Sequence, residues 1–320
     1  MKNCFLIFAF TLFSTGLFAQ EEEATDPVPD TVQIGAFIIS IHDINFQEKE
    51  YALRFWLWTL YKNVSFDFAT QLDIPNAKQI DEPQVMIDVV NGTTWHLMKM
   101  NCVMKQNWKV QNYPFDKQHL VVHIENNIYD KNRLVFVADT LGSTYDRELT
   151  LDGWRITNFE VTTTDKEYIT VFGDPSSDLL HSDYASFDII MDIERDGWGL
   201  FWKIFSGMYI AFLIAMVSFG LQVEELEPRF GLPVGGLFAA VGNKYIIDSL
   251  LPESNAFTLV DSLHAITFFT IFAILVASAW CLRLYHQSKE ASARQLNRRA
   301  SVTLLLLYIL INVYLVVQSI

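Results

Sequence analysis

Hydrophobic and polar residues alternate in short runs over the first part of the chain, from Thr31 to about Arg195. A period of two predicts β-strands with one buried face, and turn-forming residues separate the runs. Because no helical pattern lies between them, the spacing predicts an antiparallel β-sandwich over residues 31–196. The runs cover residues 31–41, 51–61, 84–90, 94–104, 119–125, 133–139, 153–164 and 186–194.

One turn between these runs carries a specific signal. Asn91-Gly92 separates residues 84–90 from residues 94–104, and this dipeptide is preferred in two-residue β-hairpins. Asn91 also fits a glycosylation sequon with Thr93. Since a hairpin is expected at this place, we favour the turn.

From residue 197 onward the pattern changes to long uncharged stretches. Lys203 and Glu224 enclose the first of them, which is long enough to cross a bilayer. Similar stretches cover residues 262–282 and 300–320. With a glycine-rich segment between them, they predict a transmembrane bundle of helices over residues 197–320. The helices are expected at about residues 198–222, 229–250, 257–287 and 298–319.

The second segment, residues 227–252, is unusually polar and rich in glycine for a membrane helix. Lys244 and Asp248 are ionisable, and such groups at membrane depth cost about 2.5–3.5 kcal/mol each unless they face protein or water. At i and i+4 these two residues are expected to pair. One helical face combines small residues with aromatic rings, and we expect it to line a pore. This face carries Gly231, Gly235, Phe238, Gly242, Tyr245 and Ser249.

Two independent patterns orient the chain in the membrane. Residues 1–19 combine a lysine, an apolar run and a small residue, which favours a secretory signal peptide over a transmembrane helix. An acidic tail over residues 20–30 follows it, and the signal peptide places the β-domain outside. Residues 283–299 are rich in Arg and Lys, and the positive-inside rule places that linker in the cytoplasm. A bundle of four helices satisfies both constraints.

Composition and charge exclude several classes of function. The net charge of −14 argues against nucleic-acid binding, which needs a basic surface. Cys4, Cys102 and Cys281 are too few and too scattered for a disulfide framework or a zinc site. An enzyme has little support, because no nucleophile–base pair, metal spacing or phosphate loop stands out. His119 and His123 lie in one predicted strand and are expected to pack or pair.

The tetrapeptide Tyr113-Pro114-Phe115-Asp116 adds a family resemblance. An all-β domain with this tetrapeptide in a hairpin loop, followed by four helices, resembles the pentameric ligand-gated ion channels, specifically their bacterial members. The resemblance covers essentially the whole chain after residue 19. It implies a homopentamer in a bacterial inner membrane, with a periplasmic β-domain, ligands at subunit interfaces and the second helix around a central pore. Further matches follow in order at residues 85–99, Gly153-Trp154, Arg195, Leu251-Pro252 and Thr258.

The sequence also departs from the family pattern. Gln106 and Leu120 stand where animal members carry the loop cysteines, so no disulfide is expected to close this loop. The proline usual within the first membrane helix is absent. Asp73 replaces a common aromatic residue before Ile74-Pro75, which puts an inherited ligand pocket in doubt.

The resemblance and the physics of pores together indicate how ions would pass. Five copies of Glu227 would form a ring of carboxylates at the cytoplasmic mouth, and such rings favour cations. Against this, the charge of Arg229 would offset the field, Pro228 resembles the anion-selective pattern shifted by one residue, and a solvated turn is the simplest alternative. Phe238 and Tyr245 are candidate constrictions that would close the pore by dewetting, and ordinary packing is the alternative.

The resemblance implies that a few contacts couple the β-domain to the helices. The tetrapeptide loop is expected to rest on the link between the second and third helices. Asp116 in this loop is expected to pair with Arg195, joined by a carboxylate from the first β-hairpin. An ion pair with a purely structural role is the alternative. The candidate coupling residues are Asp43, Glu48, Pro114, Asp116, Arg195 and Pro252.

Ligand recognition is expected from aromatic residues between subunits, which suit cationic amines through cation–π attraction. By position, Tyr129, Phe172 and Tyr184 are the candidates on one subunit. Tyr61 is the candidate on the complementary side. Surface or core aromatic residues are the alternative for each of them.

A second chemistry is possible in the last β-hairpin. Asp174, Asp178 and Asp183 would favour a divalent cation, or would sense protons together with His181. Solvated carboxylates are the simpler explanation. Modulation by calcium or protons therefore stays open, and no cofactor is expected.

Two functions from different classes follow from these patterns. The first is a homopentameric, ligand-gated, cation-selective channel that binds a small-molecule or ionic ligand. The second is a non-conducting membrane receptor or scaffold with the same fold, which the unusual pore helix motivates. A current recording across a reconstituted bilayer separates them.

Overall fold

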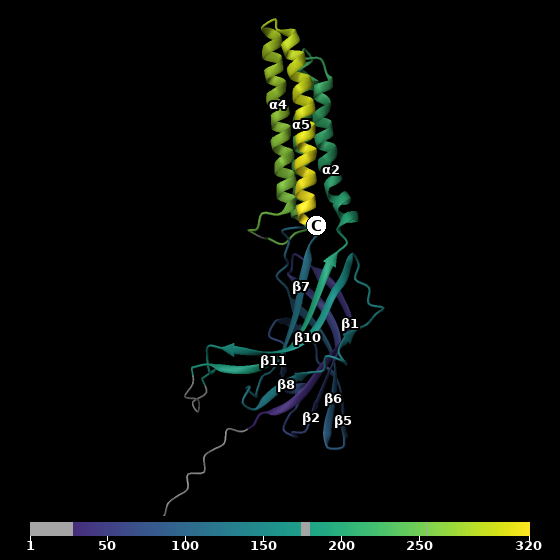
Figure 1. The fold of residues 1–320 in the computed structure, drawn as a ribbon, viewed down its shortest axis with the longest axis vertical. Coiled ribbons are helices and arrows are strands. Elements are labelled where there is room, and N and C mark those ends of the chain that lie inside the picture. The colour runs from purple at the N-terminus through teal and green to yellow at the C-terminus, as the bar shows by residue number, and fades with distance from the viewer. Residues whose placement is uncertain (1–27, 174–179, 254) are drawn as a thin grey trace, which may run out of the picture.

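The computed structural model describes residues 28–173, 180–253 and 255–320. The expected signal peptide, most of the acidic tail, Asp174 and Asp178 lie outside these residues. A β-domain is followed by a bundle of long helices that extends away from it (Figure 1). The C-terminus returns to the junction between the two parts.

The β-domain is a sandwich of two sheets. Its elements are β1 (Asp30–Asn45), β2 (Glu50–Tyr61), α1 (Phe68–Gln71), β3 (Leu72–Asp73), β4 (Ala77–Ile80), β5 (Gln84–Val90), β6 (Thr93–Lys105), β7 (Lys117–Asn126), β8 (Leu134–Ala138), β9 (Thr144–Tyr145), β10 (Trp154–Tyr168) and β11 (Ser182–Arg195). One sheet has the order β4-β6-β2-β1-β8, with β5 beside β6 and β9 beside β1, and the other has the order β10-β11-β7-β3. The sandwich is confirmed, although β1 pairs in parallel with β8 and β9.

Alternating burial explains why the predicted runs form this sandwich. Along β2, Leu53, Phe55 and Leu57 are fully buried between the sheets, while the residues between them are more exposed. Asn91-Gly92 joins β5 to β6 with φ angles of 53° and 75°. Both residues lie in the left-handed region that a type I′ turn requires, so the predicted hairpin is confirmed.

The bundle contains four helices long and apolar enough to cross a membrane. They are α2 (Gly197–Val217), α3 (Leu226–Asp248), α4 (Leu259–His286) and α5 (Glu290–Ser319), and a short 3₁₀ turn, η1 (Ser218–Gly220), follows α2. Helix α5 begins well before residue 298, because its charged first turns extend the helix beyond the apolar segment. An ion pair of 3.1 Å between Glu290 and Arg294 supports this extension.

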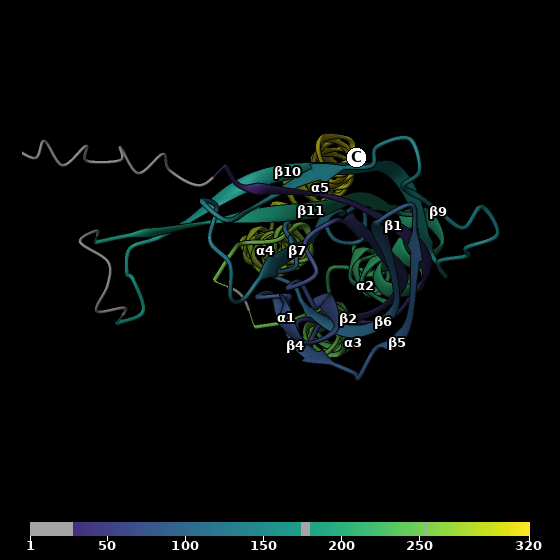
Figure 2. The ribbon, with the colours of Figure 1, turned by 90° about the horizontal axis from the view of Figure 1, so that it is seen from below.

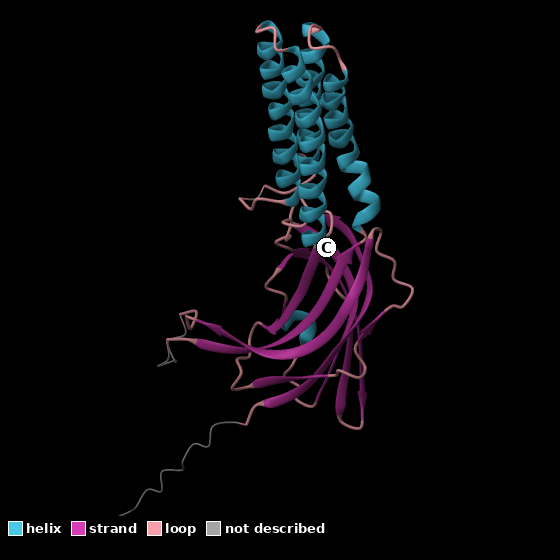
Figure 3. Cartoon of the chain, turned by 45° about the horizontal axis from the view of Figure 1, so that its top comes forward, coloured by secondary structure: helices cyan, strands magenta, loops and turns pink. Residues whose placement is uncertain are grey.

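The arrangement of the helices fits a multi-pass membrane protein. Helix α4 starts at the β-domain and ends at the far end of the bundle, so the basic linker lies opposite the sandwich (Figure 3). Viewed along the bundle, α3 and α5 lie on opposite sides, with α2 and α4 between them (Figure 2). One face of α3 is therefore uncovered in the single chain.

Candidate functional site

Helix α3 presents two contrasting faces. The face toward the other helices is buried and carries Arg229, Pro233, Gly236, Ala240 and Ile247. The other face carries the residues predicted to line a pore, and all of them are exposed: Gly231, Gly235, Phe238, Gly242, Tyr245 and Ser249. Phe238 and Tyr245 are 72% and 77% exposed. The structure thus separates a packing face from a free face on the same helix.

The glycines of α3 serve two different purposes. A Cβ atom on Gly236 would meet the Ala211 carbonyl oxygen of α2 at 2.6 Å, so this glycine permits a close crossing of the two helices. A Cβ atom on Gly231, Gly235 or Gly242 would meet nothing within 4 Å. These three glycines therefore leave the free face open instead of packing it.

Glu227 and Arg229 point in different directions at the far end of α3. Glu227 is exposed in the first turn of the helix. Arg229 is fully buried and donates hydrogen bonds to the Leu221 carbonyl at 3.1 Å and to the Asn297 side chain of α5. The guanidinium is thus directed into the bundle, away from the free face. The sequence carried no signal for Asn297, because this contact joins distant segments.

Lys244 forms two ion pairs near the C-terminal end of α3. Its Nζ atom lies 2.8 Å from Asp248 Oδ2, the pair expected at i and i+4, and 2.8 Å from Asp261 Oδ1 of α4. Asp261 also accepts hydrogen bonds from Thr258, which caps α4. The lysine therefore ties the pore-candidate helix to the start of its neighbour.

Arg195, at the end of β11, is enclosed at the junction between the two domains. Its Nε donates to Asp116 Oδ1 at 2.7 Å, and the Asp116 side chain is only 1% exposed. The guanidinium carbon lies 4.0 Å from the Trp154 ring centroid, 4.8 Å from that of Phe46 and 5.1 Å from that of Tyr113. Three aromatic rings and one carboxylate thus hold a charge that water barely reaches.

The first β-hairpin contributes to this junction in an unexpected way. Among the described residues neither Asp43 nor Glu48 forms an ion pair or a side-chain hydrogen bond with Arg195, and the Asp43 carboxylate lies 3.7 Å from His42. The intervening residues reach the junction instead: Phe46 packs on Arg195, and the Gln47 side chain donates to the Ser249 carbonyl at the end of α3. The hairpin therefore touches the pore-candidate helix directly.

The tetrapeptide loop packs on the start of the bundle. The Pro114 carbonyl faces Gly197, and a Cβ atom on Gly197 would collide with it. The Phe115 ring centroid lies 5.0 Å from that of Trp198. The Gln111 carbonyl, just before the tetrapeptide, accepts from the Leu259 amide at 2.7 Å. Pro252 lines a cavity of about 290 Å³ with Val110, Lys244, Thr258 and Asp261, among others.

Two of the predicted ligand-binding residues lie together in a cluster of three aromatic rings. The Phe172 and Tyr184 centroids are 6.3 Å apart, and Tyr168 lies 5.5 and 5.7 Å from them. The Tyr168 hydroxyl donates to Glu125 Oε2 at 2.8 Å. Burial raises the pKa of the Glu125 carboxyl, and burial with this hydrogen bond raises the pKa of Tyr168 to about 12. Tyr168 and Glu125 were not among the predicted residues; they sit on β10 and β7 of one sheet, with β11 between them.

The other two predicted ligand-binding residues lie elsewhere. Tyr129 packs on Phe66, with centroids 5.0 Å apart. Tyr61 is 5% exposed in the sandwich core, beside Phe68 and His96. The structure therefore brings Phe172 and Tyr184 together and leaves Tyr129 and Tyr61 outside their cluster.

The last hairpin is described only in part. The Asp183 carbonyl accepts from the Lys131 amide at 2.7 Å, and His181 is exposed. Within the described ranges, no group of three or more His, Cys, Asp or Glu residues is placed to hold a metal ion.

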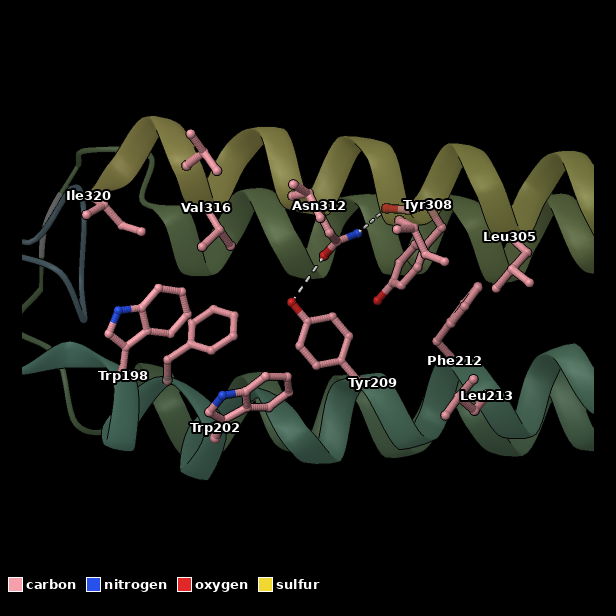
Figure 4. A pocket seen from close by; sticks show the side chains of 14 residues that line it. Trp198, Trp202, Tyr209, Phe212, Leu213, Leu305, Tyr308, Asn312, Val316 and Ile320 are labelled. Atoms are coloured by element: carbon pink, nitrogen blue, oxygen red, sulfur yellow. Dashed lines mark hydrogen bonds between the residues drawn. The ribbon is translucent and has the colours of Figure 1, made fainter.

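A separate apolar groove lies between α2 and α5 (Figure 4). Its volume is about 560 Å³, and Trp198 and Trp202 line its end near the β-domain. Two of its polar side chains are hydrogen-bonded within the bundle: Tyr209 donates to Asn312 Oδ1 at 3.4 Å, and Asn312 donates to the Tyr308 carbonyl at 2.8 Å. The groove offers no ion path, so the free face of α3 is the candidate pore surface.

Comparisons with known proteins agree with this architecture. No protein-family model matches the chain. The chain is 22% identical over 215 residues to a protein of Lymnaea stagnalis described as "Gamma-aminobutyric acid receptor subunit beta". The match covers 66% of this chain and 41% of that relative, so the chain spans less than half of the relative's length. The β-sandwich followed by four membrane-capable helices matches the fold of the Cys-loop receptors, and this distant similarity supports that superfamily.

Proposed function

We propose that the chain is a subunit of a homopentameric ligand-gated ion channel in a bacterial inner membrane, with the β-domain in the periplasm and α3 around the pore. One observation carries the proposal. The buried face of α3 is packed against the other helices, while the opposite face leaves Gly231, Gly235 and Gly242 unfilled beside two exposed rings. A helix facing only lipid has no need of such a surface, whereas a pore requires small side chains and constrictions.

Cation selectivity follows from the direction of the charges at the cytoplasmic mouth. Glu227 is exposed, and the buried Arg229 is hydrogen-bonded within the bundle. In a pentamer the carboxylates would form a ring at the mouth with no arginine side chain between them, and such rings favour cations. Phe238, in mid-helix, is the proposed gate.

A small amine is the proposed ligand class. The rings of Tyr168, Phe172 and Tyr184 attract cations through their faces, and the Glu125 carboxylate beside them adds negative charge. The distant relative is named for γ-aminobutyric acid, which carries an amino group. We propose that the ligand contacts this three-ring cluster at a subunit interface.

Current recordings on the reconstituted protein test the channel and its selectivity. Under a salt gradient, amine-evoked currents are expected to reverse near the cation equilibrium potential. Glu227→Gln is expected to move the reversal potential toward that of chloride. Glu224→Gln is the matched control and should leave the reversal potential unchanged, because the Tyr285 hydroxyl donates a hydrogen bond to the Glu224 carboxylate at the end of α4.

Reversal at the chloride potential in the wild type would overturn cation selectivity. Silence of both the wild type and Phe238→Ala would favour the non-conducting receptor.

The ligand cluster is tested by the concentration of amine that half-activates the channel. Phe172→Ala removes one ring and is expected to raise this concentration about tenfold, the equivalent of one desolvated cation–π contact. Tyr129→Ala, outside the cluster, is the matched comparison and should have a smaller effect. An equal response of both variants would remove the three-ring cluster as the binding site.

A further inference from the structure

A buried histidine of α4 belongs to a hydrogen-bond network that spans three helices. His264 is fully buried, with 0% of its surface accessible to solvent. Its Nε2 lies 3.1 Å from Asn243 Oδ1 of α3, and its Nδ1 lies 2.8 Å from the Val260 carbonyl. Asn243 Nδ2 donates to the Ile204 carbonyl of α2 at 3.0 Å. The network therefore joins α2, α3 and α4 at one level of the bundle.

The donors in this network decide which form of His264 completes it. The Ile204 and Val260 carbonyls can only accept, so Asn243 must turn its NH2 group toward Ile204 and its oxygen toward His264. Both ring nitrogens of His264 then face acceptors. Only the imidazolium carries a proton on both nitrogens. All three hydrogen bonds form together only when His264 is protonated.

Neutral His264 leaves one hydrogen bond of the network unmade, and the nitrogen that keeps its single proton decides which one. If Nδ1 keeps its proton for Val260, Nε2 becomes an acceptor, and Asn243 must rotate its amide to donate to it. This rotation places the Asn243 oxygen against the Ile204 carbonyl, where neither atom has a proton. The hydrogen bond between α2 and α3 is then lost. If Nε2 keeps the proton instead, Asn243 keeps its bond to Ile204, and the bond from Nδ1 to the Val260 carbonyl is lost.

The groups around His264 can balance its positive charge. Helix α3 contributes Lys244 and Asp248, and α4 contributes Asp261. Helix α2 contributes the uncharged Phe205 ring, 5.9 Å away. Lys244 and the two carboxylates together carry one net negative charge, so a proton on His264 brings the group to neutrality. Balance of this kind is what a buried charge requires.

We propose that His264 is a proton-dependent positioning residue that fixes the pore-candidate helix α3 to α2 through Asn243. Acidification adds the one hydrogen bond that the neutral ring leaves unmade, so it strengthens the network that holds α3. The consequence for current rests on the proposed function. The hydrogen bonds act on α3 whether or not the chain conducts.

Two variants hold the network in its opposite states. His264→Gln supplies an NH2 group to Asn243 Oδ1 without titrating near neutral pH, so it keeps the bond to Ile204 at every pH. Asn243→Leu removes this bond at every pH. His286→Gln, at the far end of the same helix, is the matched control.

The test is the pH profile of the unfolding equilibrium of the full-length protein in detergent, between pH 5 and 8. We expect the His264-dependent part of the wild-type profile to lower the unfolding constant roughly fivefold as the pH falls from 8 to 5, the equivalent of one hydrogen bond. His264→Gln and Asn243→Leu should both lack this part, while His286→Gln should keep it. In current recordings evoked by γ-aminobutyric acid, the same variants should lose the same part of the pH dependence.

The outcomes separate this proposal from the proposed function. An unfolding profile of His264→Gln that matches the wild type would overturn the positioning role. If His264→Gln and Asn243→Leu both flatten the profile but neither the wild type nor any variant conducts, the channel proposal fails and the positioning role stands.

Discussion

At the scale of single residues, the junction between the domains depends on where charges are placed. Arg195 is paired with Asp116 and enclosed by the rings of Phe46, Tyr113 and Trp154. Gln118 donates a further hydrogen bond of 2.7 Å to Asp116. Because both charged side chains are almost completely buried, removal of either partner leaves the other as a buried charge without a counter-charge.

Asp116→Asn is expected to destabilise the protein by about 3 kcal/mol, because it leaves the buried Arg195 without a counter-charge. The measurement is the free energy of unfolding of the full-length protein in detergent. Asp43→Asn, in the exposed first hairpin, is the matched control and should change it by less than about 0.5 kcal/mol. Equal effects of the two substitutions would mean that the buried ion pair does not stabilise the junction.

His123 predicts a pH dependence of stability within the β-domain. A hydrogen bond to Asp188 raises the pKa of His123, and burial of Asp188 is outweighed by hydrogen bonds from His123, Ser186 and Thr164, which lower the pKa of its carboxyl. The charged histidine is thus favoured in the folded state. Its contribution is fully present below the unfolded pKa of about 6.5 and is lost as pH rises through the raised folded pKa.

The stability difference between the wild type and His123→Gln should therefore be larger at pH 6 than at pH 9. The His123 side chain is 45% exposed, so the difference is expected to be only about 0.2–1 kcal/mol. Denaturant midpoints at the two pH values measure it, and His181→Gln on the exposed hairpin is the control. A difference that grows with rising pH would contradict the assignment.

At the scale of elements, α3 is a glycine-rich helix with two different faces, one packed and one free. Gly236 lies at the crossing with α2, and Gly235, its neighbour in sequence, lies on the free face. Pro233 is on the buried face, and α3 continues through it as one helix. Neighbouring positions of this helix should therefore respond to the same substitution in opposite ways.

Gly236→Ala is expected to destabilise the bundle by about 1–3 kcal/mol, because its Cβ atom would force α2 and α3 apart. Gly235→Ala is the matched partner and should leave stability unchanged or raise it by up to about 1 kcal/mol, since alanine favours the helix. Thermal unfolding distinguishes the two. If Gly235 also lines the pore, its alanine variant should lower the single-channel conductance, and equal destabilisation by both would refute the two-faced helix.

At the scale of the whole molecule, the two domains meet through a small number of close contacts. The tetrapeptide loop lies on the start of α2, Gln111 bonds the start of α4, and Gln47 bonds the end of α3. Each contact joins a loop of the sandwich to the end of a helix. These loops therefore connect movements of one domain to the other.

Gly197→Ala tests this junction, because its Cβ atom would collide with the Pro114 carbonyl. We expect a loss of stability of about 1–3 kcal/mol and a changed concentration–response curve for amine-evoked current. Gly199→Ala is the control, since a Cβ atom there meets nothing within 4 Å. Unfolding and current measurements on both variants test this expectation. Identical results for the two variants would show that neither stability nor activation depends on the contact between Gly197 and Pro114.

The sequence by itself determined the elements of this protein. Alternation with a period of two predicted the long strands, Asn91-Gly92 predicted a hairpin, and uncharged stretches predicted the helices. These are local signals, because the side chains that produce them are neighbours along the chain. The shortest elements, such as α1 and β3, carry too few residues for a period to be visible.

Only the tertiary structure decided which side chains meet. The direction of Arg229, the second partner of Lys244 and the enclosure of Arg195 by Phe46 and Trp154 all depend on packing between distant segments. The same holds for the pairing of Tyr168 with Glu125, which lie on different strands. A period within one segment places a residue on a face, but the neighbour that covers this face comes from elsewhere in the chain.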